Sequence, residues 1–275
     1  MIMCIYRTIP FTFIPIISRY IHAVLFTIIF ATLLQSGNSQ EGDDWNYLVL
    51  SLTWPPTFCS KVECKLPPRM NDFNIHGLWP SVWPGRQPTN CSAHPAFDID
   101  KLWDLRGQLD SEWVNLMDYQ NPIPFWEHEW YKHGQCATED TLISDELGYF
   151  NTSLVLKDKI DLLDILNSYG IQPANDQLLG NRKEFEIMVN YGITYHKSTL
   201  LHTLRHAYNA RVLITCQKKP EYERRRRHRH RHNQLALLSE VRFCFTPQLE
   251  LIDCPMHEVD NTIQCPKWIE FPEFN

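Results

Sequence analysis

Groups that can transfer protons or bind anions are concentrated in two short stretches of this sequence. Residues 75–80 read IHGLWP, and residues 125–136 read FWEHEWYKHGQC. They contain three histidines, His76, His128 and His133, together with Glu129 and Lys132. Imidazoles exchange protons at neutral or mildly acidic pH, a carboxylate can orient an imidazole, and an ammonium group can neutralise an anion. These residue types predict acid–base chemistry on an anionic substrate.

The second stretch has to be tested against a zinc site, because His128-Glu129 begins as the HExxH motif does. That motif places its histidines four residues apart, whereas His128 and His133 are five apart. On an α-helix these two side chains would diverge by roughly 140°. Glu129 and His133 are four apart and share a helix face. The chain also has no CxxC pair, so we expect neither a metal nor another cofactor.

Such a set of groups suits the cleavage of RNA. A base removes the proton of the 2′-hydroxyl, the oxyanion attacks the adjacent phosphorus, and an acid protonates the leaving 5′-oxygen. The product end is a 2′,3′-cyclic phosphate. A lysine and a further imidazolium can offset the charge that develops on phosphorus. DNA lacks the 2′-hydroxyl and would not react.

Both stretches resemble the signature segments of the ribonuclease T2 family of secreted acid ribonucleases. The segments ITC at 214–216 and EVRFCF at 240–245, and the last cysteines, also fit. The resemblance covers roughly residues 45–268. It implies an α+β fold, with a twisted antiparallel sheet, packed helices and stapling disulfides. It also implies a metal-independent endoribonuclease that cleaves single-stranded RNA and forms cyclic phosphate ends.

The resemblance assigns a role to each titratable residue of the two stretches. His133 would take the 2′-hydroxyl proton, and His76 would protonate the leaving oxygen. Glu129 and Lys132 would stabilise the transition state, and His128 would bind phosphate. All of these positions are filled, so we expect an active enzyme.

Four further residues of these stretches, or next to them, carry expectations. Trp79 matches a base-stacking position of the family. Ser81 stands where the family often has Asp, which leaves the base preference open. Trp126 and Trp130, four residues apart, are expected to pack in the core and not to contact a ligand.

The nine cysteines become an even number if Cys4 is removed with a leader. Eight cysteines allow 105 pairings, so spacing alone does not settle which form. The family resemblance implies four disulfides, Cys59–Cys64, Cys91–Cys136, Cys216–Cys265 and Cys244–Cys254.

The amino terminus has the features of a secretory signal. The first 39 residues contain no Asp or Glu, and they include Arg7, Arg19, an apolar run at 23–34, and small residues at Gly37 and Ser39. The run is shorter than the about 20 residues of a membrane span. We expect cleavage near residue 39, with an uncleaved signal anchor as the alternative. The product would be secreted or delivered to lysosomes or endosomes, with no membrane span.

The sequons at Asn90 and Asn151 are candidate glycosylation sites.

The elements expected around the two stretches form a single catalytic domain over residues 40–275, expected to be a monomer. The strand candidates are 46–53, 73–79 (ended by Pro80), 184–190, 210–216 and 235–245. Helical spacing of apolar residues predicts helices within 98–118, 125–135 and 153–168.

A basic loop at about 218–234 stands apart from this pattern. Its arginines are Arg224, Arg225, Arg226, Arg227, Arg229 and Arg231, interleaved with histidines. Three interpretations stay open. The loop could be solvated without a specific role, it could bind polyanions such as RNA or glycosaminoglycans, or it could be a proprotein-convertase cleavage site.

The formal net charge of −6 excludes a generally basic nucleic-acid binder but allows a local basic site. An alternative function follows from the sequons and the basic loop. The chain could be a secreted immunomodulatory effector glycoprotein that acts by binding glycan receptors or polyanions, with catalysis incidental.

Overall fold

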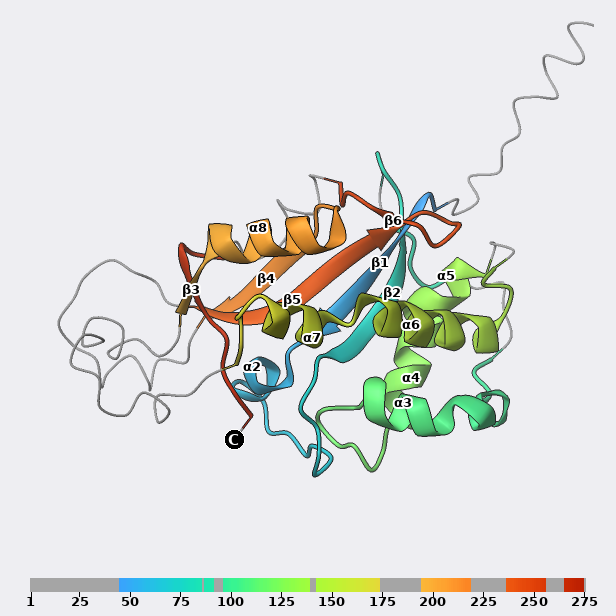
Figure 1. Cartoon of the computed structure of the whole chain (residues 1–275). Helices are drawn as coiled ribbons and strands as arrows, with labels where there is room; N and C mark the ends of the chain where they lie inside the picture. The colour runs from blue at the N-terminus through green and yellow to red at the C-terminus, as the bar shows by residue number, and fades with distance from the viewer. Residues whose placement is uncertain are drawn as a thin grey trace, which may run out of the picture. The chain divides into compact units, whose positions relative to one another are not determined.

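The computed structural model describes residues 45–85, 87–91, 96–138, 142–173, 194–218, 236–255 and 265–274. The predicted leader, the strand at 184–190 and the basic loop with its arginines lie outside the described residues. The described strands form one sheet in the order β2-β1-β5-β7-β3, and β4 and β6 also pair with β5. Helices pack against this sheet, so the α+β prediction is confirmed (Figure 1).

The middle of the sheet comes from two apolar runs of the sequence. These are β1 (Tyr47–Thr53) and β5 (Ala236–Phe245), within one residue of the predicted bounds. Next to β1 lies β2 (Asn74–Ser81), which runs through Pro80 and does not end before it as predicted. β2 is the last strand in the sheet order, and an edge strand tolerates a residue without an N–H.

The remaining strands lie on the other side of β1. They are β3 (Thr194–His196), β4 (Leu213–Lys218), β6 (Leu251–Ile252) and β7 (Trp268–Glu270). β4 confirms the strand predicted at 210–216. Among the described strands, β5 pairs with β7 in parallel and the other pairs are antiparallel.

The two faces of the sheet differ in what covers them. Alternate residues of a strand point to opposite faces. Leu48, Leu50 and Leu52 join the main core, while Tyr47 and Val49 belong to a smaller cluster with Cys244 and Cys254. Figure 1 shows three helices across one face, α6 (Glu146–Ile160), α7 (Leu162–Ser168) and α8 (Lys197–Tyr208). The main core fills the space beneath these helices, which leaves the opposite face for a site.

The helix predicted over 153–168 is two helices. α6 starts earlier, where the side chain of Asp145 accepts a hydrogen bond from the N–H of Gly148. The break falls at Asp161, whose φ of 45° is left-handed. α7 ends before Gly170, as predicted, and Gly170 has a φ of 73°.

Of the one or two helices predicted within 98–118, the structure has two, and they end at residue 112. A 3₁₀ segment, η1 (Ile99–Leu105), leads into α3 (Arg106–Glu112). After α3 the chain turns to meet β2. Asn74 donates to the carbonyl of Val114 and accepts from its N–H, at 3.0 and 2.7 Å. This tertiary pairing overrides the helical spacing of residues 113–118. A short helix that was not predicted, α2 (Pro55–Cys59), follows β1.

Four disulfides staple the domain. They are Cys59–Cys64, Cys91–Cys136, Cys216–Cys265 and Cys244–Cys254, the pairs implied by the family resemblance. No helix in the described part of the chain is long and apolar enough to cross a membrane.

Candidate active site

His76 and Trp79 reach the open face of the sheet because β2 contains a bulge. Ser51 pairs with Gly77 but Leu52 pairs with Ile75, so His76 is the extra residue. Residues three apart on a regular strand point to opposite faces. The bulge cancels this alternation and lets His76 and Trp79 share a face, as bulges near active sites often do. The indole Nε1 of Trp113 donates to the carbonyl of His76 at 3.2 Å, which fixes the bulge.

The second stretch forms a helix with a π-turn in its middle. It begins as α4 (Ile123–Glu129), continues as the π-helical η2 (Trp130–Gly134) and ends as α5 (Gln135–Ala137). The N–H of Gln135 donates to the carbonyl of Trp130, five residues back. π-turns are frequent at functional sites. Trp126 and Trp130 are buried in the main core, as predicted.

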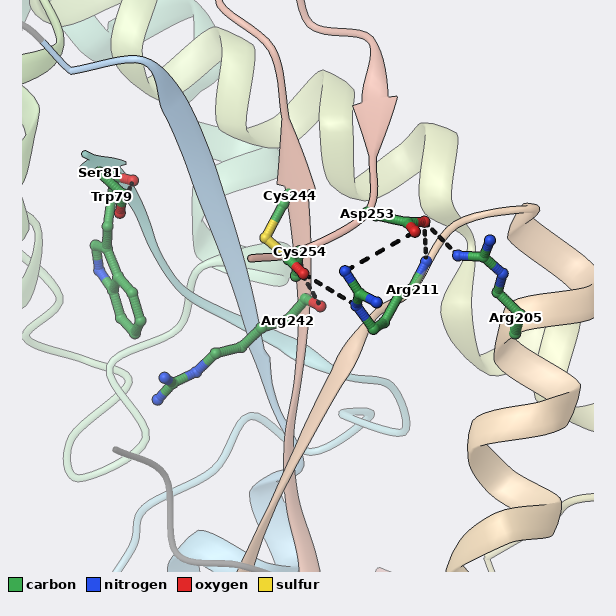
Figure 2. The surroundings of a disulfide bond; sticks show 8 residues. All are labelled: Trp79, Ser81, Arg205, Arg211, Arg242, Cys244, Asp253 and Cys254. Atoms are coloured by element: carbon green, nitrogen blue, oxygen red, sulfur yellow. Dashed lines mark hydrogen bonds and ion pairs between the residues drawn. A yellow bond between two sulfur atoms is a disulfide. The ribbon is translucent and has the colours of Figure 1, made fainter. Parts of the chain in front are cut away.

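Trp79 joins the two stretches. Its indole Nε1 donates to Oε2 of Glu129 at 3.2 Å. Its ring centroid lies 5.1 Å from that of His76 and 5.5 Å from that of His133. One indole therefore contacts both imidazoles, and four of the predicted site residues form one contiguous group. Ser81 lies just beyond, where its buried hydroxyl donates to the carbonyl of Trp79 at 3.2 Å (Figure 2).

The two imidazoles of this group have opposite pKa shifts. Burial, followed by the charges of Lys132 and His76, lowers the pKa of His133 to about 3. Burial also acts to lower the pKa of His76, but the hydrogen bond and charge of Glu240 outweigh it and the pKa is raised. At mildly acidic pH His133 is thus neutral and can accept a proton, while His76 is protonated and can donate one.

The ring nitrogens of His133 are not equivalent. His133 is 5% exposed, and its Nδ1 is buried without a hydrogen-bond partner among the described residues. Nε2 is therefore the nitrogen that can reach a substrate. An unsatisfied buried polar atom is uncommon in a folded protein and is consistent with a functional role.

Glu129 is closely packed and almost fully excluded from solvent. It is 2% exposed, and burial raises the pKa of its carboxyl despite His76, Trp79 and Lys132. Gly77 lies against it, and a methyl group at Gly77 would overlap both the Glu129 carboxylate and the Trp79 indole. This position therefore has room for glycine alone.

His128 and Lys132 lie on the outer side of the same helix. With Asn90, Glu127 and Tyr131, and with Pro124, they line an open hollow of about 280 Å³. Burial and then the charge of Lys132 lower the pKa of His128. His76 and His133 do not line this hollow, which lies beside the inner group around Trp79, close enough for the charge of Lys132 to act on His133.

The loop before the second stretch is tied to its helix at two points. The N–H of Asn90 donates to the carbonyl of Lys132 at 3.0 Å, and Cys91 is bonded to Cys136. Asn90 is exposed, as is Asn151 on α6, so both sequon side chains are accessible to a glycosylating enzyme.

Three residues around His76 were not among the predicted site residues. Glu240 and Arg242 come from β5, and Thr53 comes from β1. Glu240 Oε1 lies 2.7 Å from Nδ1 of His76. Their signal in the sequence was present. In a strand whose other residues are apolar except for Ser239, two charged side chains two positions apart mark one face of the sheet.

Comparisons with known proteins identify the family of this chain. The sequence profile of the Ribonuclease T2 family matches residues 45–254. Ribonuclease Oy of Magallana gigas is 32% identical over 82% of this chain and 93% of its own length. Extracellular ribonuclease LE of Solanum lycopersicum is 32% identical over 61% of this chain and 74% of its own. A crystal structure of a ribonuclease MC1 mutant with 5′-GMP, a protein of bitter gourd seeds, has a TM-score of 0.63 and 25% identity. That match covers 83% of this chain and all of the other. The chain therefore belongs to the ribonuclease T2 family.

Proposed function

We propose that this protein is an endoribonuclease that cleaves single-stranded RNA through attack of the 2′-hydroxyl on the adjacent phosphorus. The observation that carries the proposal is the pair of imidazoles that both contact the ring of Trp79. One is neutral because it is buried, and the other is held protonated beside Glu240. A base and an acid that are ready at the same pH are what this reaction requires.

The reaction proceeds in one exchange of bonds at phosphorus. Nε2 of His133 takes the proton of the 2′-hydroxyl as O2′ bonds to phosphorus. The bond from phosphorus to O5′ breaks, and O5′ receives the proton of His76. The products are a 2′,3′-cyclic phosphate and a free 5′-hydroxyl. The protein's own side chains supply both proton transfers, so the reaction needs no metal.

The other charged residues act on the developing charge. Lys132 offsets the negative charge at phosphorus, and Glu129 supports the transition state through His76, whose protonated form its charge favours. His128 with Lys132 holds a phosphate at the outer hollow. Trp79 offers its ring to a base, a contact that tolerates all four bases because each has a π-face.

We further propose that the chain is secreted after removal of residues 1–39, and that Asn90 and Asn151 carry glycans. The proposal is supported by the composition of the leader, by the exposure of both asparagines and by the four disulfides, which form in oxidising compartments. The tomato relative is named an extracellular ribonuclease.

A single-atom change in the substrate tests the proposed chemistry. Two oligonucleotides are compared that each contain a single test linkage. In the first, a ribonucleotide precedes that linkage, and in the second the same nucleotide lacks its 2′-hydroxyl. We expect cleavage of the first and none of the second above background, because the nucleophile is missing. Equal cleavage of the two would show that water, and not the 2′-hydroxyl, attacks phosphorus.

A further inference from the structure

We propose that Glu240 and Arg242 form a positioning pair that sets the orientation and the charge of His76 in the reaction. This inference rests on the proposed function, because it assigns His76 the role of the acid. Neither residue needs to touch the substrate. They act from β5, two strands away from β2 in the sheet, through contacts that cross the sheet face.

The carboxylate of Glu240 meets donors from three side chains on this face. Oε1 lies 2.7 Å from Nδ1 of His76 and accepts from the hydroxyl of Thr53 at 3.2 Å. Oε2 accepts from Nε and a terminal nitrogen of Arg242, at 3.1 and 2.7 Å. Thr53 and Glu240 are direct partners in the β1–β5 register. The carboxylate is therefore fixed from both sides and cannot swing away from His76.

A buried carboxylate of this kind is costly unless it is fully paired. Glu240 is 9% exposed. Its burial acts to raise its pKa, but the hydrogen bond and charge of His76, with the charge of Arg242, lower the pKa to about 2. Buried ion pairs contribute little net stability compared with apolar residues of similar size. A functional role accounts for this arrangement better than a gain in stability.

The contact decides which nitrogen of His76 faces the substrate. The ionised carboxylate accepts the proton of Nδ1, so Nε2 is the nitrogen left to donate to O5′. The side chain of His76 is 40% exposed, so Nε2 has access to the open face. A carboxylate partner that fixes tautomer and ring orientation is a recurrent device for histidines in enzymes.

The charged groups that face His76 set the sign of each effect. From β5, Glu240 raises the pKa of His76 and Arg242 lowers it, and from α4 Glu129 raises it. His133 and His128 on the same helix also interact electrostatically with His76. Arg242 therefore does not charge His76. Its role is geometric, since it holds Oε2 of Glu240, and its guanidinium carbon lies 5.0 Å from the centre of the Trp79 ring (Figure 2).

Two variants separate these effects. In Glu240→Gln the shape is kept and the charge is lost, so the pKa of His76 falls. We expect the alkaline limb of the kcat/KM profile to move down by about 1 pH unit, and kcat to fall about 10- to 100-fold. In Arg242→Gln a cation that lowers the pKa of His76 is removed. We expect kcat to fall without any downward movement of that limb.

Asp253 provides a matched control. It follows β6 and pairs with Arg205 and Arg211 (Figure 2). It is not among the groups that shift the pKa of His76. Asp253→Asn makes the same carboxylate-to-amide change in another ion-pair cluster. We expect its pH profile to stay in place, and thermal unfolding establishes that each variant is folded.

The pKa of His76 is also measured directly, by NMR titration of its imidazole in the wild type and in Glu240→Gln. A lower pKa in the variant supports the inference. The inference is overturned if neither the alkaline limb nor the pKa of His76 moves in Glu240→Gln. It is also overturned if the alkaline limb moves down by the same amount in Arg242→Gln. If the wild type does not cleave RNA, the proposed function fails, but the titration still tests whether Glu240 sets the charge of His76.

Discussion

A His133→Phe variant loses RNA cleavage by about 10³-fold in kcat/KM, because the neutral imidazole that takes the 2′-hydroxyl proton is removed. The replacement keeps an aromatic ring in a position that is 5% exposed and in contact with Trp79. The expected loss is therefore one of chemistry and not of fold. Initial rates on a defined oligoribonucleotide measure it.

The same variant should lose less stability than the wild type when the pH falls from 8 to 5. In the unfolded chain His133 takes up a proton as pH falls through its ordinary value of 6.5, while the folded protein takes it up only near pH 3. Falling pH therefore favours the unfolded wild type, by about 2 kcal/mol between pH 8 and pH 5. The phenyl ring of the His133→Phe variant binds no proton, so the variant escapes this loss. Denaturant unfolding at the two pH values measures the difference.

His202, exposed on α8, supplies the control. His202→Phe should leave both cleavage and the pH dependence of stability as in the wild type. If His133→Phe cleaves at the wild-type rate, His133 is not the base. If its unfolding free energy changes with pH in parallel with the wild type, His133 is not held neutral by burial.

A Gly77→Ala variant lowers kcat/KM by about 10²-fold although the residue has no chemistry of its own. The added methyl group would overlap the carboxylate of Glu129 and the indole of Trp79, so at least one must shift. Glu129 is hydrogen-bonded to Trp79, which in turn contacts His133, so the shift spreads through the inner group. Displacements of about 1 Å can cost such a factor, and overpacking costs about 1–3 kcal/mol of stability.

Gly107 on α3 is the matched control, because a methyl group there meets no atom within 4 Å. Gly107→Ala should keep full activity and gain up to about 1 kcal/mol, since alanine favours a helix. Wild-type cleavage by Gly77→Ala would mean that the close approach of Glu129 to β2 is not needed.

The central strands and the residues that gather around Trp79 could be predicted from the sequence because their signals are local. β1 and β5 are apolar runs that need no partner to be recognised. His76, Glu129 and His133 lie in two compact stretches whose residue types and spacing already limit the chemistry. Gly77 is also part of the first stretch, but the need for a glycine there is evident only from the fold, which brings Glu129 against it.

The features that were missed depend on pairing across the chain. Glu240 is 164 residues from His76, and the β1–β5 register and the bulge in β2 bring them together. The helix α8 was missed because its start has an unusual cap, the ring of His196 accepting from the N–H of Ser198. The π-turn in η2 uses residues with ordinary helical spacing. No local pattern distinguishes it from an α-helix.

The central claim is that the 2′-hydroxyl displaces the 5′-oxygen through His133 and His76, with no metal. Its most direct test is digestion of a defined oligoribonucleotide, with and without EDTA, followed by mass spectrometry of the short-time product ends. We expect a 2′,3′-cyclic phosphate and a 5′-hydroxyl at equal rates in both conditions. A 5′-phosphate end, or loss of cleavage in EDTA, would contradict the account.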